Sequence, residues 1–228
     1  MSRNKKQPPS HEVRADERHA YERVIARQRG YRYGTDAAYN GRADDEIAGA
    51  YFGALLQSPL IADHISELGV VYRTRGEFPG SYAHQDREWI DMVLGHELGV
   101  YMWGHVLDGI AVGVDPDDVI ALHEGRYDDI SPDRRELAAY IRAFEHLEVT
   151  DEQYESLERR FGERGAVEYT AFVAHLCLTL RLLKVYSEHG EGGRLTAEEI
   201  VREVKRVKAG EIALPDPRAR VPQLTISV

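Results

Sequence analysis

Two carboxylates and two imidazoles stand within an otherwise apolar and aromatic stretch of the chain, between Asp86 and His105. These four residues are Glu88, His96, Glu97 and His105. Ionisable groups are costly to bury without a partner, so their presence in such a stretch needs a reason. Imidazoles and carboxylates are also the groups that most often move protons in enzymes. The stretch therefore predicts a small proton-transfer site.

A helix over residues 82–98 is expected to carry three of these groups. At about 100° per residue, His96 falls on one stripe with Trp89, and Glu97 falls beside Val93, so both should face the interior. Two interpretations of Glu97 follow. Burial disfavours the charged form of a carboxyl group, which would make Glu97 an acid of raised pKa. Alternatively, Glu97 pairs with an arginine, and His96 is a core histidine bonded to a backbone carbonyl.

His105 follows Tyr101, Met102 and Trp103 at a predicted helix start. The positive end of the helix dipole disfavours the cationic form of a histidine placed there. The position therefore predicts a neutral base near pH 7. The alternative is a histidine that only caps or packs.

Other polar positions have weaker patterns. His84, Glu88 and Asp91 share one helix face, which would suit a metal ion but is more often simply solvated, so we expect no metal. His175 lies mid-helix among apolar residues and is either pocket lining or core. A phosphate-binding glycine loop, a serine-hydrolase elbow and a zinc-protease motif are all missing from the sequence.

Composition excludes several classes of protein. The 228 residues carry a net charge of −10, which disfavours binding to nucleic acid or to an anionic membrane. The basic start has no apolar segment typical of a secretory signal, and no apolar run approaches the length of a membrane span. The single cysteine, Cys177, excludes a Cys-x-x-Cys redox pair. We expect a cytoplasmic protein.

Helix punctuation dominates the chain. Ser58-Pro59 and Ser131-Pro132 are typical of helix starts, and Thr150 with Gln153 matches a capping box. No strand-like alternation appears before residue 211, so the predicted class is all-α, with a long apolar helix over 166–187. We expect a flexible N-terminal arm with a surface helix over 1–43, a helical domain over 44–190, and a C-terminal helix with an extended tail over 191–228.

The order of several short segments resembles the carboxymuconolactone decarboxylase / AhpD-like family over roughly residues 45–187. The segments are Ser58-Pro59-Leu-Ile-Ala-Asp, Arg87-Glu88-Trp89, Trp103-Gly-His105-Val with Gly113-Val114, Ser131-Pro132-Asp-Arg-Arg-Glu-Leu, and Phe161-Gly-Glu-Arg-Gly-Ala-Val-Glu168. The resemblance implies an AhpD-like all-helical fold, assembly as trimers or hexamers, and a site between helices near a subunit interface.

The same resemblance assigns the family's glutamate to Glu88 and its helix-start histidine to His105, and it implies that Glu88 orients His105 or relays its proton. The family's peroxidase branch carries a Cys-x-x-Cys pair before that histidine, and this chain has none, so peroxidase activity is not expected. In the decarboxylase branch a glutamate precedes the tryptophan, where this chain has Met102. Glu97 is then a hypothetical replacement for the missing carboxylate.

Together these observations predict a cofactor-free lyase that performs acid–base chemistry on a small carbonyl, lactone or carboxylate compound. The expected catalytic residues are His105, Glu88 and Glu97, and the expected substrate-binding residues are Tyr101, Trp103, His96, His175 and Met102. Two alternatives remain. One is a non-catalytic oligomeric binding protein of the same fold, and the other is a metal-assisted hydrolase that uses His84, Glu88, Asp91 or His96.

Overall fold

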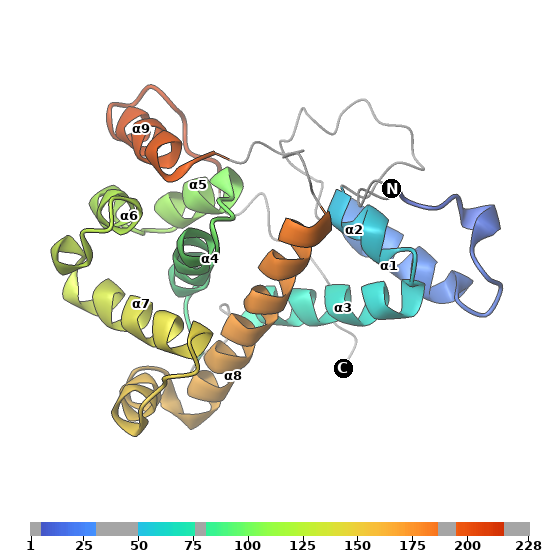
Figure 1. Cartoon of the computed structure of the whole chain (residues 1–228), viewed down its shortest axis with the longest axis horizontal. Helices are drawn as coiled ribbons and strands as arrows, with labels where there is room; N and C mark the ends of the chain where they lie inside the picture. The colour runs from blue at the N-terminus through green and yellow to red at the C-terminus, as the bar shows by residue number, and fades with distance from the viewer. Residues whose placement is uncertain (1–5, 31–49, 76–80, 187–194, 217–228) are drawn as a thin grey trace. The chain divides into compact units, whose positions relative to one another are not determined.

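The computed structural model describes residues 6–30, 50–75, 81–186 and 195–216. Within these ranges the fold is all-helical, with nine α-helices, two short 3₁₀ helices and no strand, as predicted (Figure 1). The α-helices are α1 (Arg18–Gly30), α2 (Ala50–Leu55), α3 (Pro59–Arg75), α4 (His84–Leu98), α5 (Trp103–Ala111), α6 (Pro116–His123), α7 (Pro132–Glu145), α8 (Asp151–Tyr186) and α9 (Ala197–Lys208). The 3₁₀ helices are η1 (Ser10–Glu12) and η2 (Tyr127–Asp129).

The predicted helix starts are confirmed. Helices α3 and α7 begin at Pro59 and Pro132. The backbone N–H of Gln153 donates to the Thr150 hydroxyl, while the Gln153 side chain accepts from the Thr150 backbone N–H. Helix α8 is interrupted at Gly162, whose φ of 74° and ψ of 167° are not helical and suit a residue without a Cβ. The long apolar helix expected over 166–187 follows this interruption and extends to Tyr186.

The chain divides into two compact units, the first comprising 1–71, 185–191 and 216–228 and the second 72–184 and 192–215. The predicted boundaries at 43/44 and 190/191 lie outside the described residues, as does the end of the predicted extended tail. In the first unit, Asp63 is buried and forms ion pairs with Arg23 and Arg27. A buried carboxylate held by two guanidiniums ties α1 to α3 within this unit.

Helix α4 lies at the centre of the second unit, in contact with α5, α6 and α7 (Figure 1). Every residue from Glu88 to Gly95 is buried, so α4 has no solvent face in its middle. Three ionisable groups of α4 are enclosed with the apolar ones, namely Asp86, Glu88 and Asp91. Buried carboxylates need partners, and their partners define the candidate site.

Aromatic side chains of α8 complete the core of the second unit. Tyr169 and Phe172 are buried, and the ring of Tyr82 packs against both. Among the described helices, α8 is long and apolar enough to cross a membrane by length and composition alone, a test that the core helix of a globular protein also passes. The buried face of α8 accounts for its apolar composition here.

Candidate functional site

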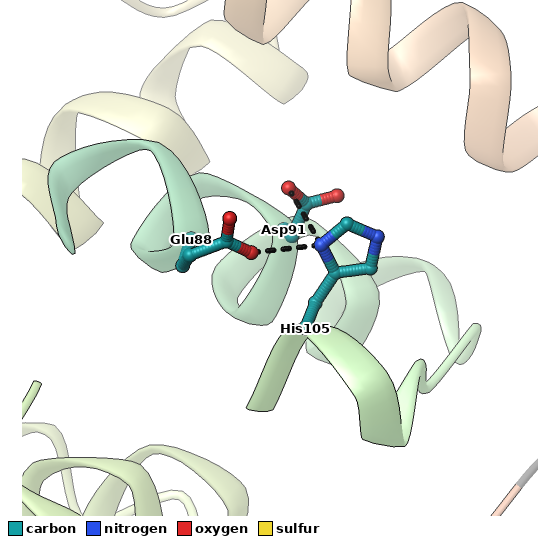
Figure 2. Close-up of side chains that lie close together, drawn as sticks. All are labelled: Glu88, Asp91 and His105. Atoms are coloured by element: carbon teal, nitrogen blue, oxygen red, sulfur yellow. Dashed lines mark hydrogen bonds and ion pairs between the residues drawn. The ribbon is translucent and has the colours of Figure 1, made fainter. Parts of the chain in front are cut away.

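Glu88 and His105, 17 positions apart in sequence, meet across the contact between α4 and α5 (Figure 2). The Nδ1–H of His105 donates to Oε2 of Glu88 at 2.8 Å. The Glu88 side chain is 3% exposed and the His105 side chain 21% exposed. The glutamate is thus enclosed, while the imidazole keeps an accessible edge. The predicted pairing of Glu88 with His105 agrees with this geometry.

Gly109 makes this approach of the two helices possible. It lies one turn beyond His105 on α5, and a Cβ built there would come within 3.1 Å of the Glu88 Cβ and 2.1 Å of the Met92 Cε. A larger residue would therefore push α5 away from α4. The absence of a side chain at Gly109 therefore lets α5 approach α4 closely enough for the His105 ring to contact Glu88.

Asp91 is the third member of the cluster. Its Oδ2 lies 3.5 Å from Nδ1 of His105, and its Oδ1 is buried without a hydrogen-bond partner. Figure 2 shows both carboxylates, from consecutive turns of α4, on the Nδ1 side of the ring, with Nε2 on the opposite edge. The sequence-based expectation of a solvated His84, Glu88 and Asp91 face is wrong for the two acids, because α4 is covered on all sides in its middle.

The second oxygen of Glu88, Oε1, has its own partners. The Nη2 and Nε of Arg87 donate to it at 2.9 and 3.2 Å, and Nε2 of His84 lies 2.9 Å away. The same His84 nitrogen also contacts the Arg87 guanidinium. An imidazole nitrogen either donates or accepts, so these two His84 contacts are not hydrogen bonds at the same time. The Arg87–Glu88 ion pair needs no such choice and fixes the orientation of Glu88.

The charges of the cluster shift its pKa values in different directions. Burial alone would raise the pKa of Glu88, but His105, His84 and Arg87 together hold it well below the ordinary 4.5. Burial alone would lower the pKa of His105, but Asp91 and Glu88 outweigh burial and raise it above 6.5. This shift is opposite in direction to the lowering expected at a helix N-terminus, because the two adjacent carboxylates favour the charged form of His105.

Asp91 behaves differently from Glu88. Burial raises its pKa above the ordinary 3.8, and the negative charge of Glu88 acts in the same direction. The nearby cations of His105, Arg73 and Arg87 oppose this effect without overcoming it. Two carboxyl groups three residues apart on one helix thus have their pKa values pushed apart by their surroundings, an arrangement that separates acid and base roles in enzymes.

The same three groups have the spacing of a possible divalent-cation site, since their nearest ligand atoms lie within 4.8 Å of one another. The Arg87 guanidinium already rests on Glu88, however, and Nδ1 of His105 carries the proton that Glu88 accepts. A positive neighbour and a protonated ring nitrogen both oppose a cation. The arrangement therefore favours a bound proton over a bound metal ion. His96, which the hydrolase alternative also names, lies two turns beyond Glu88 along α4.

His96 belongs to a second cluster. Its Nδ1 lies 3.4 Å from Nδ1 of His123, and the rings of Tyr101 and Tyr127 lie edge-on nearby. Burial lowers the pKa of both histidines, to about 3 for His123. The two imidazoles are therefore neutral at pH 7. The predicted substrate-binding residues His96 and Tyr101 thus contact each other and His123.

Glu97 lies on the opposite end of α4 from Glu88. Its Oε1 accepts a hydrogen bond from the Tyr127 hydroxyl at 2.9 Å, and the Arg142 Nε lies 2.9 Å from the same oxygen. The Arg142 contact is an ion pair rather than a hydrogen bond, because the Nε–H lacks the required direction. Of the two interpretations of Glu97, the structure shows the one with an arginine partner.

The other predicted substrate-binding residues are spread around the core. Met102 and Trp103 are half-buried, pack against the core and stand at the start of α5. The His175 ring lies 5.3 Å from the ring of Tyr72, and burial lowers the pKa of His175 to about 4. The positive charge of Arg73 acts to lower the pKa values of both His175 and His105, so the end of α3 lies near both histidines.

The sequence pattern did not point to Arg87 or His123 as site residues, and it offered His84 and Asp91 only as metal ligands. The spacing of three positions already placed Asp91 on the helix face of Glu88. His123 could not be found in this way, since its approach to His96 depends on how α6 packs on α4.

The hollows described in this structure lie away from His105. One, of about 160 Å³, is lined by α7 and the first turns of α8, including Tyr140 and Arg160. Another, shallow and about 450 Å³, lies along α9. Access to His105 in the described chain is limited to the exposed part of its ring.

Comparisons with known proteins identified no relative of this chain. No family model matches it, and no curated protein or solved structure gives a significant match. Any assignment of function therefore rests on the site and on the resemblance of the sequence segments given above.

Proposed function

We propose that this protein is a cofactor-free, carboxymuconolactone decarboxylase-like enzyme that uses His105 as a general acid–base. The proposal follows the sequence resemblance to that family, with its AhpD-like fold and homo-oligomeric, cytoplasmic character. The observation that carries it is the contact of the His105 Nδ1–H with the buried Glu88 carboxylate at 2.8 Å. The substrate would be a small carbonyl, lactone or carboxylate compound.

The geometry assigns different tasks to the two ring nitrogens. Because Nδ1 donates to Glu88, the neutral ring keeps its proton on Nδ1 and leaves the lone pair on Nε2. Nε2 lies on the edge opposite the carboxylates (Figure 2). It is therefore the atom that would take a proton from a carbon next to a carbonyl, or return one to an enolate.

Glu88 supports this exchange without meeting the substrate. Arg87 holds its Oε1, so its Oε2 stays directed at His105 and stabilises the imidazolium. Asp91 and Glu88 outweigh burial and raise the pKa of His105 above 6.5, which favours the imidazolium. The site is consequently set to deliver a proton, and its acid form is lost as the pH rises through the raised pKa.

The test is proton exchange in D₂O. A panel of small 2-oxo acids, ketones and lactones would be followed by ¹H NMR for loss of the protons next to the carbonyl, and for product formation. With a substrate found in this way, His105→Ala should lower the rate by about 10²–10⁴-fold. His19→Ala, which removes an exposed histidine of α1, is the matched control and should leave the rate unchanged. A smaller loss for His105→Ala would remove His105 from the mechanism.

A second candidate is a non-catalytic binding protein with the same helical scaffold. It is favoured by the enclosure of the site, since Glu88 is held by Arg87 as well as His105 and the His105 ring is only 21% exposed. This candidate predicts no exchange above the buffer rate with any compound of the panel. Metal analysis of the purified protein tests the hydrolase alternative, which requires one bound ion per chain.

A further inference from the structure

Asp91 lies against His105 but has no place in the mechanism described so far. Its side chain is 3% exposed, its Oδ2 lies 3.5 Å from Nδ1 of His105, and its Oδ1 has no hydrogen-bond partner in the described part of the chain. Burying a charged carboxylate oxygen without a hydrogen-bond partner costs more free energy than burying an unpaired neutral group. Such a residue is retained where it has a functional role or where it is protonated and therefore neutral.

The single Nδ1–H of His105 cannot satisfy two carboxylates. It points to Glu88, at 2.8 Å, and Glu88 has the further support of Arg87 and His84. Asp91, at 3.5 Å, is left with attraction between charges but no hydrogen bond. Three charged groups face it besides Glu88: His105 from α5, Arg87 from α4 and Arg73 from the end of α3.

We propose that Asp91 is a positioning residue of His105 that holds an exchangeable proton of its own, so that the cluster of Glu88, Asp91 and His105 takes up two protons rather than one. When Asp91 is protonated, the imidazolium faces one negative charge, from Glu88. When Asp91 loses its proton to solvent, the imidazolium faces two and holds its own proton more firmly. The inference deepens the proposed function and rests on it for its use, because it explains how His105 remains an acid over a wider range of pH.

The pKa directions agree with this arrangement. Burial raises the pKa of Asp91, whereas the pKa of Glu88 lies well below its ordinary value. Protons shared in a coupled cluster leave in steps that belong to the group as a whole. Replacing Asp91 should therefore change the titration of His105, although Asp91 makes no hydrogen bond to it.

The experiment is an NMR titration of the histidine rings in wild-type protein, Asp91→Asn, Glu88→Gln and the control Asp133→Asn, with His105 assigned from His105→Ala. Asp133 is exposed, with 82% of its side chain accessible, so its replacement should leave His105 unaffected. We expect His105 to titrate above 6.5 in wild-type protein and at lower pH in both Asp91→Asn and Glu88→Gln. An Asp91→Asn protein in which His105 titrates as in wild type would overturn the inference.

A second measurement distinguishes a proton-holding residue from a structural one. Asp91→Asn removes a buried charge without a hydrogen bond, so the variant should be at least as stable as wild type in thermal unfolding at pH 7. Its advantage should shrink as the pH is lowered toward the range where Asp91 takes up its proton. Loss of stability in Asp91→Asn at pH 7 would mean that Asp91 serves the fold.

If Asp91→Asn fails to fold, the wild-type protein still decides. With ¹³C-labelled aspartate carboxyls, one aspartate should titrate above the ordinary 3.8, in step with a shift of the His105 ring. Absence of such an aspartate counts against the proposal. None of these measurements uses a substrate, so the two proposals fail separately. Coupled titration of Asp91 and His105 without turnover of any substrate would contradict the proposed function alone. Turnover without coupled titration would contradict this inference alone.

Discussion

Replacing Glu88 by glutamine is the sharpest perturbation of the site, because it removes one charge and almost no volume. A hydrogen bond to a charged group contributes about 1.5–3 kcal/mol, against about 0.5–1.5 kcal/mol for a neutral one. Glu88 makes such contacts with both His105 and Arg87, at 2.8 and 2.9 Å. At about 1 kcal/mol lost for each, Glu88→Gln should lower the free energy of unfolding by about 2 kcal/mol near pH 6.

The pH dependence of this loss follows from the two pKa shifts. The depressed pKa of Glu88 gives stability that is present above its ordinary 4.5 and is lost as the pH falls. The raised pKa of His105 gives stability that is present below its ordinary 6.5 and is lost as the pH rises through the raised value. The difference between wild type and Glu88→Gln should therefore be largest between these limits, and fall to about 1 kcal/mol, the Arg87 share, at higher pH.

The assay is urea unfolding followed by circular dichroism at several pH values from acid to alkaline, with Glu155→Gln as the control. Glu155 is an exposed glutamate of α8, and its replacement should change stability little. The reasoning is refuted if Glu88→Gln is as stable as wild type near pH 6, or if the difference between the two proteins grows as His105 loses its proton.

Two further predictions concern packing and the second histidine cluster. Gly109→Ala should lower the free energy of unfolding by about 0–2 kcal/mol, since a cost of about 1–3 kcal/mol from overpacking is offset by a gain of about 1 kcal/mol in helix propensity. It should also move the pKa of His105 toward 6.5, because α5 would shift away from α4. An unchanged titration would show that the helices do not need that close contact. The pKa of His123 is lowered to about 3, so the unfolded state binds its proton more readily and wild-type stability falls as the pH drops below 6.5. His123→Leu should flatten this acid loss in thermal unfolding at pH 7 and pH 5, and a slope equal to that of wild type would contradict the assignment.

Local signals were sufficient for the helices. Pro59 and Pro132 at helix starts, and the Thr150–Gln153 pair, act within a single turn and need no distant partner. The pairing of Glu88 with His105 agrees with the sequence resemblance rather than with any pattern within one helix.

The sequence by itself determined the helical class, because capping and periodicity are short-range properties of the chain, and its resemblance to a known family pointed to Glu88 and His105. Only the tertiary structure decided that Asp91 is buried beside them, that Glu97 pairs with Arg142, and that His96 meets His123. Periodicity divides a helix into a buried and a solvated face, but α4 is enclosed by neighbours on every side in its middle. The direction of the His105 pKa shift was decided in the same way, because folding brings the carboxylates of Glu88 and Asp91 within 3.5 Å of its ring.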